Sequence, residues 1–118
     1  MVISLIKEDT ISAVATAVGE GGIGIVRLSG PAAIKIADSL FRGIKGKKPG
    51  EMNSFTAAYG YIVNPQSGLT IDEVLLLVMR APRSYTKEDV VEIHCHGGPI
   101  PLRQILDLTI RLGARLAE

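Results

Sequence analysis

The sequence is poor in aromatic residues and carries almost no net charge. Its 118 residues include no tryptophan, two phenylalanines and three tyrosines, which leaves few rings on which unpaired bases could stack. Lysine and arginine together number 13 against 12 aspartates and glutamates, a formal charge of +1. Such a balance does not indicate a basic surface spread over a whole domain. Both features argue against a general nucleic-acid-binding protein.

Three further absences narrow the class of protein. A single cysteine, Cys95, excludes an internal disulfide and fits a reducing compartment. No window approaches the roughly 18 uncharged apolar residues of a membrane span. The apolar segment 1–6 ends at Lys7 and has no basic residues before it, unlike a signal peptide. The sequence therefore predicts a cytoplasmic protein without a membrane segment, and the lack of an arginine-rich leader favours a bacterial one.

Two glycine-containing segments partly match the sequence patterns of nucleotide-binding loops, but neither meets the full requirements of such a loop. The pair Gly46-Lys47 is followed by Lys48, and the upstream glycine of a P-loop is missing. Residues 19–24 match GxGxxG, but a strand-like segment follows the glycines where a dinucleotide site requires the start of a helix. We interpret 19–24 as a turn between two strands.

The apolar residues, 47% of the chain, suffice for the core of one domain. Alternating and β-branched residues predict five strands, at 10–17, 23–28, 55–63, 73–79 and 90–95. Apolar residues at helical spacing predict helices between Pro31 and Gly43 and between Pro99 and Gly113. A further strand begins at 114. The expected fold is α+β, a mixed β-sheet flanked by helices in one domain over residues 1–118.

Two parts of this prediction concern individual residues. Ser29 or Gly30 is expected to cap the first helix, whose apolar stripe would run on to Phe41. Residues 73–79 form a nearly continuous apolar run, which is typical of a central strand covered on both faces.

The segment His94-Cys95-His96 has the residue types of a metal site but not the spacing. Successive side chains of a strand point to opposite faces, so the three cannot converge on one tetrahedral ion. We interpret Cys95 as a core or edge residue between two surface histidines. No metal site is predicted.

Arg27 and Glu92 stand out because each occupies an otherwise apolar strand. An unpaired charge inside a sheet protein costs several kcal/mol, so each needs a partner or a water-filled cleft. One interpretation is a structural Arg27–Glu92 ion pair, or two separate rim residues. The other is a pocket for a ligand with both guanidine-like and anionic parts. The residues alone leave these interpretations open.

Four segments, taken in order, resemble one family. They are DTISAVAT at 9–16, GGIGIVRLSG at 21–30, SYTKEDVVE at 84–92 and HGGP at 96–99. Together they resemble the N-terminal domain of the MnmE (TrmE) family of tRNA-modification GTPases, over nearly the whole chain. The resemblance implies a fold similar to the folate-binding domain of glycine-cleavage T-protein, a homodimer formed through this domain, and binding of formyl-tetrahydrofolate or another one-carbon tetrahydrofolate.

For the complete protein, the resemblance implies modification of carbon 5 of the wobble uridine in certain tRNAs, together with an FAD-containing partner, MnmG (GidA). GTP, potassium and magnesium would bind only in a separate G-domain, so no catalytic residue is expected within 1–118. The family's folate-contacting arginine and glutamate fall on Arg27 and Glu92. Tyr85, in the preceding loop, could wall the pocket or simply pack within the loop.

The chemistry of a pterin suits a carboxylate. Its exocyclic amine stands beside a ring N–H, so Glu92 could accept two parallel hydrogen bonds, as it would from a guanidinium. Arg27 offers donors to a carbonyl or carboxylate of the cofactor. Two alternatives remain: a dimerisation scaffold in which Arg27 and Glu92 form an internal ion pair, and a one-carbon transferase of the T-protein type, for which 118 residues would be short.

Overall fold

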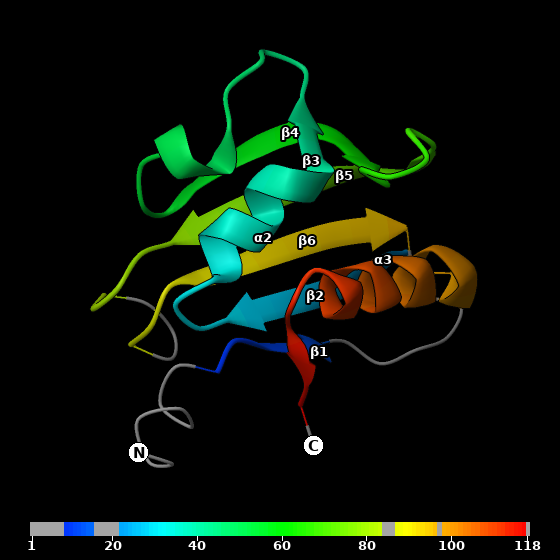
Figure 1. The fold of residues 1–118 in the computed structure, drawn as a ribbon. Helices are drawn as coiled ribbons and strands as arrows, with labels where there is room; N and C mark the ends of the chain where they lie inside the picture. The colour runs from blue at the N-terminus through cyan, green and yellow to red at the C-terminus, as the bar shows by residue number, and fades with distance from the viewer. Residues whose placement is uncertain (1–8, 16–21, 84–86, 97, 118) are drawn as a thin grey trace.

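The computed structural model describes residues 9–15, 22–83, 87–96 and 98–117. Within these residues one sheet has seven strands in the order β3-β4-β5-β6-β2-β1-β7 (Figure 1). The strands are β1 (Ile11–Val14), β2 (Ile23–Ser29), β3 (Phe41–Gly43), β4 (Thr56–Val63), β5 (Thr70–Met79), β6 (Val90–His96) and β7 (Arg115–Leu116). The helices are α2 (Ala33–Leu40), α3 (Pro99–Arg111) and the 3-10 turn η1 (Pro49–Glu51).

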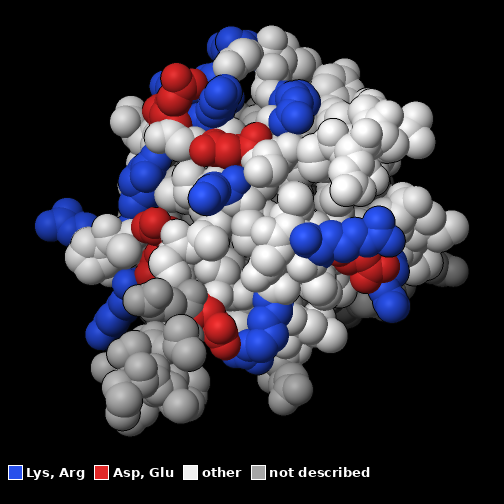
Figure 2. Space-filling view, viewed as in Figure 1, with Lys and Arg blue, Asp and Glu red and all other residues white. Residues whose placement is uncertain are grey.

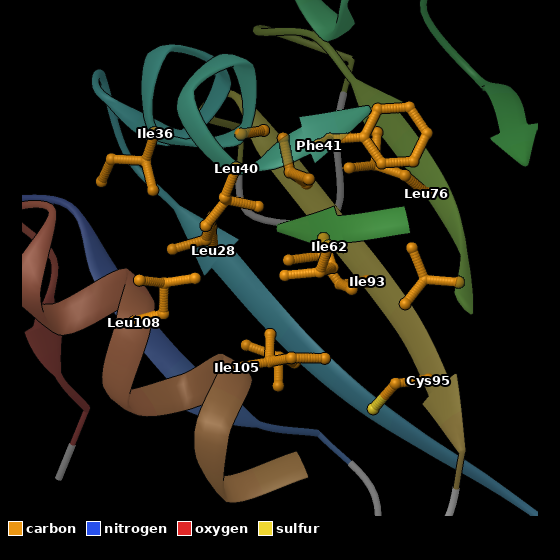
Figure 3. Packing of buried hydrophobic residues seen from close by; sticks show 14 of the residues in the cluster. Leu28, Ile36, Leu40, Phe41, Ile62, Leu76, Ile93, Cys95, Ile105 and Leu108 are labelled. Atoms are coloured by element: carbon orange, nitrogen blue, oxygen red, sulfur yellow. The ribbon is translucent and has the colours of Figure 1, made fainter. Parts of the chain in front are cut away.

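Only the β1–β7 pairing is parallel among the described strands, so the sheet is mixed. The expected α+β class with a mixed sheet is thereby confirmed. Helices α2 and α3 lie on the same face of the sheet (Figure 1). The main core fills the space between them and the sheet, around Leu28, Leu40, Ile93 and Ile105, which are almost completely buried (Figure 3). The opposite face of the sheet, which we call the open face, carries neither helix.

The first helix starts later and ends earlier than the sequence predicted. Its N-cap is Ala32, not Ser29 or Gly30, and no side chain of Ala32 can cap it. The hydroxyl of Thr10 instead accepts a hydrogen bond from the Ala32 amide at 2.8 Å. Phe41 is the first residue of β3, since its backbone is extended at φ −100°, ψ 132°. Its ring is buried all the same, so a core position was correct and its assignment to a helix was wrong.

Gly30 explains how the chain passes from β2 toward α2. Its φ of +140° lies in the region that L side chains rarely adopt. A Cβ at this position would stand 2.6 Å from the Asp9 carbonyl oxygen and 2.6 Å from the Thr10 Cα. The glycine therefore lets the start of α2 come close enough to Thr10 for the Ala32 amide to donate a hydrogen bond to the Thr10 hydroxyl.

The prediction that 73–79 is covered on both faces was wrong. Val74, Leu76 and Val78 are buried beneath the helices, but Leu75 is 43% exposed on the open face. A continuous apolar run cannot reveal whether a second layer of helices exists. Here the described chain supplies helices for one side only.

Helix α3 begins as the sequence predicted, with Gly98 as N-cap and Pro99 as its first residue. It is fixed to β1 by a buried hydroxyl pair, Ser12 Oγ to Thr109 Oγ1 at 2.8 Å. Thr109 in turn donates to the Leu106 carbonyl at 2.6 Å. In the described part of the chain, no helix is both long and apolar enough to cross a bilayer.

Candidate functional site

Arg27 and Glu92 meet on the open face of the sheet. They are directly opposite each other in the antiparallel β2–β6 register. The Arg27 Nη2 lies 2.6 Å from Glu92 Oε2, and Nε donates to the same oxygen at 2.8 Å. The structure thus contains the ion pair that the sequence allowed, between positions 65 residues apart.

His94 holds the other oxygen of the same carboxylate. Its Nε2 lies 3.0 Å from Glu92 Oε1, two residues along β6 on the same face. The Glu92 side chain is 12% exposed, against 30% for Arg27 and 24% for His94. The carboxylate is therefore largely shielded from water, with one basic side chain at each oxygen. We refer to Arg27, Glu92 and His94 as the charged triad.

The triad keeps the Glu92 carboxylate ionised. Burial by itself raises the pKa, because it penalises the charged form. Hydrogen bonds from His94 and Arg27, and the charges of these two residues, act in the opposite direction and prevail, so the pKa of Glu92 is lowered from 4.5. A ligand approaching at neutral pH meets a fixed anion that can accept further hydrogen bonds.

Apolar residues surround the triad on the open face. Leu77 stands opposite Glu92 across β5–β6, and Leu75 stands opposite His94. Ile25 of β2 faces His94 from the other side. A shallow cavity of about 280 Å³ lies beside His94, with Tyr59 and Leu75 among its lining residues. A flat, partly apolar ligand could therefore lie against the sheet while its polar edge reaches Glu92.

Cys95 points to the opposite face from His94, as the alternation of a strand requires, whereas His96 shares the face of His94 and lines the same cavity. Cys95 is 3% exposed within the core, and desolvation by burial raises the pKa of its thiol to about 11. His96 bonds Asp72 at the end of the strand, with Nδ1 2.6 Å from Oδ1. The expected placement of Cys95 on the face opposite His94 is confirmed. In the parts of the chain that the structure describes, no three His, Cys, Asp or Glu side chains are grouped to hold a metal ion.

Two sequence predictions fall outside the described residues. Tyr85, which could wall the pocket, belongs to the undescribed segment 84–86, and the first glycines of 19–24 are likewise outside. Gly24 is described, and it lies within β2 rather than at the start of a helix. Its position contradicts a dinucleotide loop and agrees with the rejection of that motif.

The comparisons with known proteins agree with these observations. The family model described as "GTP-binding protein TrmE N-terminus" matches residues 10–118. The chain belongs to this family. The match includes both members of the Arg27–Glu92 pair and the whole sheet around them. Family membership, expected from four short segments, is confirmed over nearly the full length.

Three curated relatives share the name tRNA modification GTPase MnmE. The chain is 54% identical over 110 residues to tRNA modification GTPase MnmE of Bacillus velezensis. It is 53% identical over 110 residues to that of Bacillus subtilis, and 54% identical over 111 residues to that of Carboxydothermus hydrogenoformans. These alignments cover 93% or 94% of this chain. The TrmE N-terminal chain spans only 24% of the length of these relatives.

Sequence reasoning missed one member of the charged triad. His94 was interpreted as a surface histidine, whereas it is partly buried and bonded to Glu92. Its position two residues after Glu92 on the same strand face was the available signal. Histidines are common on exposed strands. The spacing of Glu92 and His94 alone therefore could not show whether His94 contacts Glu92 or points into water.

Proposed function

We propose that this TrmE N-terminal chain binds a one-carbon tetrahydrofolate, taken here as formyl-tetrahydrofolate, at the charged triad of its open face. The observation that carries the proposal is the Glu92 carboxylate, ionised, 12% exposed and held at both oxygens by basic side chains. Such a fixed carboxylate suits a planar group with adjacent N–H donors. The residues present therefore fit the pterin end of a folate.

The donor pattern of a pterin edge matches the pair in detail. That edge presents an amine, a ring N–H and a carbonyl side by side. Glu92 would accept from the first two, while Arg27 would donate to the carbonyl. Arg27 Nε and Nη2 both contact Oε2 in this structure, so one of these N–H groups could turn to a ligand while the other remains on Glu92. His94 would hold Oε1 in place throughout.

The wider role is inferred from the relatives. We propose that the chain is a domain of a protein that modifies tRNA, as the relatives' printed name, tRNA modification GTPase, suggests. The modified position would be carbon 5 of the wobble uridine in certain tRNAs, as the family resemblance implies. The bound folate would supply the one-carbon unit. GTP hydrolysis, with potassium and magnesium, would belong to other domains, and an FAD-containing MnmG-type protein would be the partner. The fold would be that of the T-protein folate-binding domain.

Dimerisation is the second part of the proposal. The open face exposes large apolar side chains, including Ile23 at 60%, Tyr59 at 45% and Tyr61 at 36%. Such a grouping on one face is unusual for a surface that meets only water. We propose that a second copy of the chain covers part of this face, leaving the charged triad accessible to the folate.

One competing function has a specific observation in its favour. Both oxygens of Glu92 already have protein partners, as expected if the triad were only an internal ion pair in a dimerisation scaffold. In that case Arg27 and Glu92 would stabilise the sheet and bind nothing. The two functions differ in whether the chain binds folate at all.

Calorimetric titration with formyl-tetrahydrofolate separates them. The parent chain should release or absorb heat at sub-millimolar ligand, while Arg27→Ala and Glu92→Ala should bind at least about tenfold more weakly, because each removes a charged group that would hydrogen-bond the pterin. Arg103→Ala is the control, since its ion pair with Asp107 lies exposed on α3. Equal binding by all four proteins would refute the site, and no binding by the parent would favour the scaffold.

Sedimentation of the same proteins tests the dimer. The parent should sediment as a dimer at micromolar concentration, and Tyr61→Glu should shift it toward monomer, since Tyr61 is exposed on the open face but lines neither the cavity beside His94 nor the larger one beyond Tyr59. A parent that stays monomeric at high concentration would contradict dimerisation through these residues alone.

A further inference from the structure

A second cavity opens on the same face of the sheet, beyond Tyr59. Its volume is about 480 Å³, and its lining includes Met52, Ala57, Tyr59 and Leu75 together with Lys45 and Lys47. The lining is therefore mainly apolar at the sheet and basic at one rim. We refer to it as the lysine cavity. Neither the family match nor the relatives' names assign it a ligand.

The lysine cavity continues into the cavity beside His94. Tyr59 and Leu75 line both of them, so the two share a wall and form one shallow path across the open face. Leu75 is 43% exposed and Tyr59 is 45% exposed along this path. An elongated ligand could thus pass from the charged triad to the lysine rim over a continuous apolar surface.

The strand register gives the length of the path. Arg27, Glu92, Leu77 and Ala57 occupy one row across β2, β6, β5 and β4. Three steps between neighbouring strands, at about 4.8 Å each, place Ala57 roughly 14 Å from Arg27. Ala57 lines the lysine cavity. The distance from this cavity to the triad is therefore one that an extended small molecule could span.

Lys45 and Lys47 have no counterion among the described residues. Neither makes a hydrogen bond or an ion pair with any described residue, whereas Arg42 and Arg80 both donate to nearby carbonyl groups. Gly46, at φ +79°, forms the turn between the two lysines, closed by its amide on the Gly43 carbonyl at 3.0 Å. Two lysines without a described ion-pair partner thus line a mainly apolar cavity. A negatively charged chain is the complementary partner.

Charges on the helix-bearing face are arranged differently. There, lysines and arginines lie among aspartates and glutamates (Figure 2). Helix α3 illustrates this, since Arg103 Nε lies 3.1 Å from Asp107 Oδ1. Lys45 and Lys47 differ from Arg103 in that neither forms an ion pair with a described carboxylate, although Lys47 also lines a neighbouring cavity with Asp38.

We propose that the lysine cavity is the subsite for the carboxylate tail of the ligand, and that the chain accordingly selects poly-γ-glutamyl folates over the monoglutamate. This inference rests on the proposed folate function and adds a specificity to it. The pterin end would lie at Arg27 and Glu92, the apolar middle over Leu75 and Tyr59, and successive glutamyl carboxylates at Lys45 and Lys47. The lysines would contribute affinity through charge, so the preference should weaken with salt.

The test compares two ligands, formyl-tetrahydrofolate as monoglutamate and as pentaglutamate, by calorimetric titration of the same chain. The pentaglutamate should bind roughly fivefold more tightly at low salt, the size expected for two exposed ion pairs. Lys45→Ala/Lys47→Ala should reduce this preference to less than about twofold, and should weaken binding of the monoglutamate less than binding of the pentaglutamate. Lys48→Ala is the matched control, since Lys48 lies in the same loop but lines a different cavity.

Each other outcome is decisive. Equal affinity for the two ligands, with binding still dependent on Glu92, would overturn the tail subsite and leave the folate function intact. A preference that Lys48→Ala reduces as much as the double variant would assign it to general charge, against the proposal. If neither ligand binds, the proposed function fails and the subsite fails with it. If the double variant changes only the dimer constant, a second copy of the chain occupies the cavity instead.

Discussion

Glu92 and His94 stand two residues apart on β6, with Glu92 Oε1 3.0 Å from His94 Nε2. Arg27 holds the other oxygen from the neighbouring strand. The carboxylate therefore cannot rotate freely, and its plane is set before any ligand arrives. Fixing an acceptor in advance reduces the entropy that binding must remove. In this account His94 is a positioning residue that acts through Glu92.

The role of His94 predicts a difference between two substitutions. His94→Gln keeps an N–H near the position of Nε2 and should bind formyl-tetrahydrofolate within about twofold of the parent. His94→Leu removes the donor that fixes the carboxylate and should weaken binding about fivefold to tenfold, which corresponds to about 1 kcal/mol, the net worth of an ordinary hydrogen bond. Calorimetric titration gives both affinities. Equal loss in the two variants would show that the imidazole itself, and not its hydrogen bond, is what matters.

The lowered pKa of Glu92 predicts a pH-dependent contribution to stability. A carboxyl whose pKa is lower in the folded than in the unfolded state stabilises the fold above the unfolded value, and this stabilisation is lost as pH falls through the folded value. The parent should therefore exceed Glu92→Gln in free energy of unfolding above pH 4.5, and the difference should shrink at lower pH. Urea unfolding of both proteins between pH 7 and pH 3 measures it. A difference that is constant or grows on acidification would contradict the account.

Cys95 should be almost unreactive in the folded protein. Its pKa is raised to about 11 by burial, and the residue is 3% exposed. At pH 8 only about one thiol in a thousand would be ionised even with free access, and the thiolate is the reacting species. Labelling with a disulfide reagent should require unfolding and should be complete within seconds in urea. Rapid labelling of the native protein would contradict the buried position of Cys95.

The Ser12–Thr109 pair predicts coupling between β1 and α3. Thr109→Val keeps the shape but leaves the buried Ser12 hydroxyl without its acceptor, which should cost about 1–3 kcal/mol. Adding Ser12→Ala removes the unsatisfied group, so the double variant should be destabilised by less than the sum of the two single changes. Thermal or urea unfolding of the four proteins completes the cycle. Strict additivity would show that the two hydroxyls do not interact.

The prediction of the site from sequence was strongest where a charge conflicts with its surroundings. Arg27 and Glu92 could be identified as candidate site residues because burying a charged side chain in an apolar strand costs free energy unless the charge has a partner. Their pairing depends on the β2–β6 register, a long-range contact that local patterns do not specify. His94 gave no such conflict, since a histidine tolerates both water and partial burial. Its part in the triad became visible only with Glu92 beside it.

The fold could be predicted where local chemistry decides the backbone. Pro99 defines the start of α3, and its place at the start of a helix was predicted correctly. The extent of α2 was predicted incorrectly. The hydroxyl that caps this helix belongs to Thr10, which lies 22 positions before Ala32, the residue whose amide donates the hydrogen bond. The open face of β5 was also missed. An apolar run such as 73–79 shows that a strand is apolar on both sides, but not what covers each side.

The central claim is that Glu92 binds the donor edge of a pterin. The most direct test is a thermodynamic cycle between the parent and Glu92→Gln, each titrated with formyl-tetrahydrofolate and with an analogue whose 2-amino group is replaced by methyl. Losing the amine should weaken binding to the parent about tenfold or more, as expected for a hydrogen bond to a charged group, and should affect Glu92→Gln far less. An equal loss in both proteins would show that Glu92 does not contact the amine, and would contradict the proposed site.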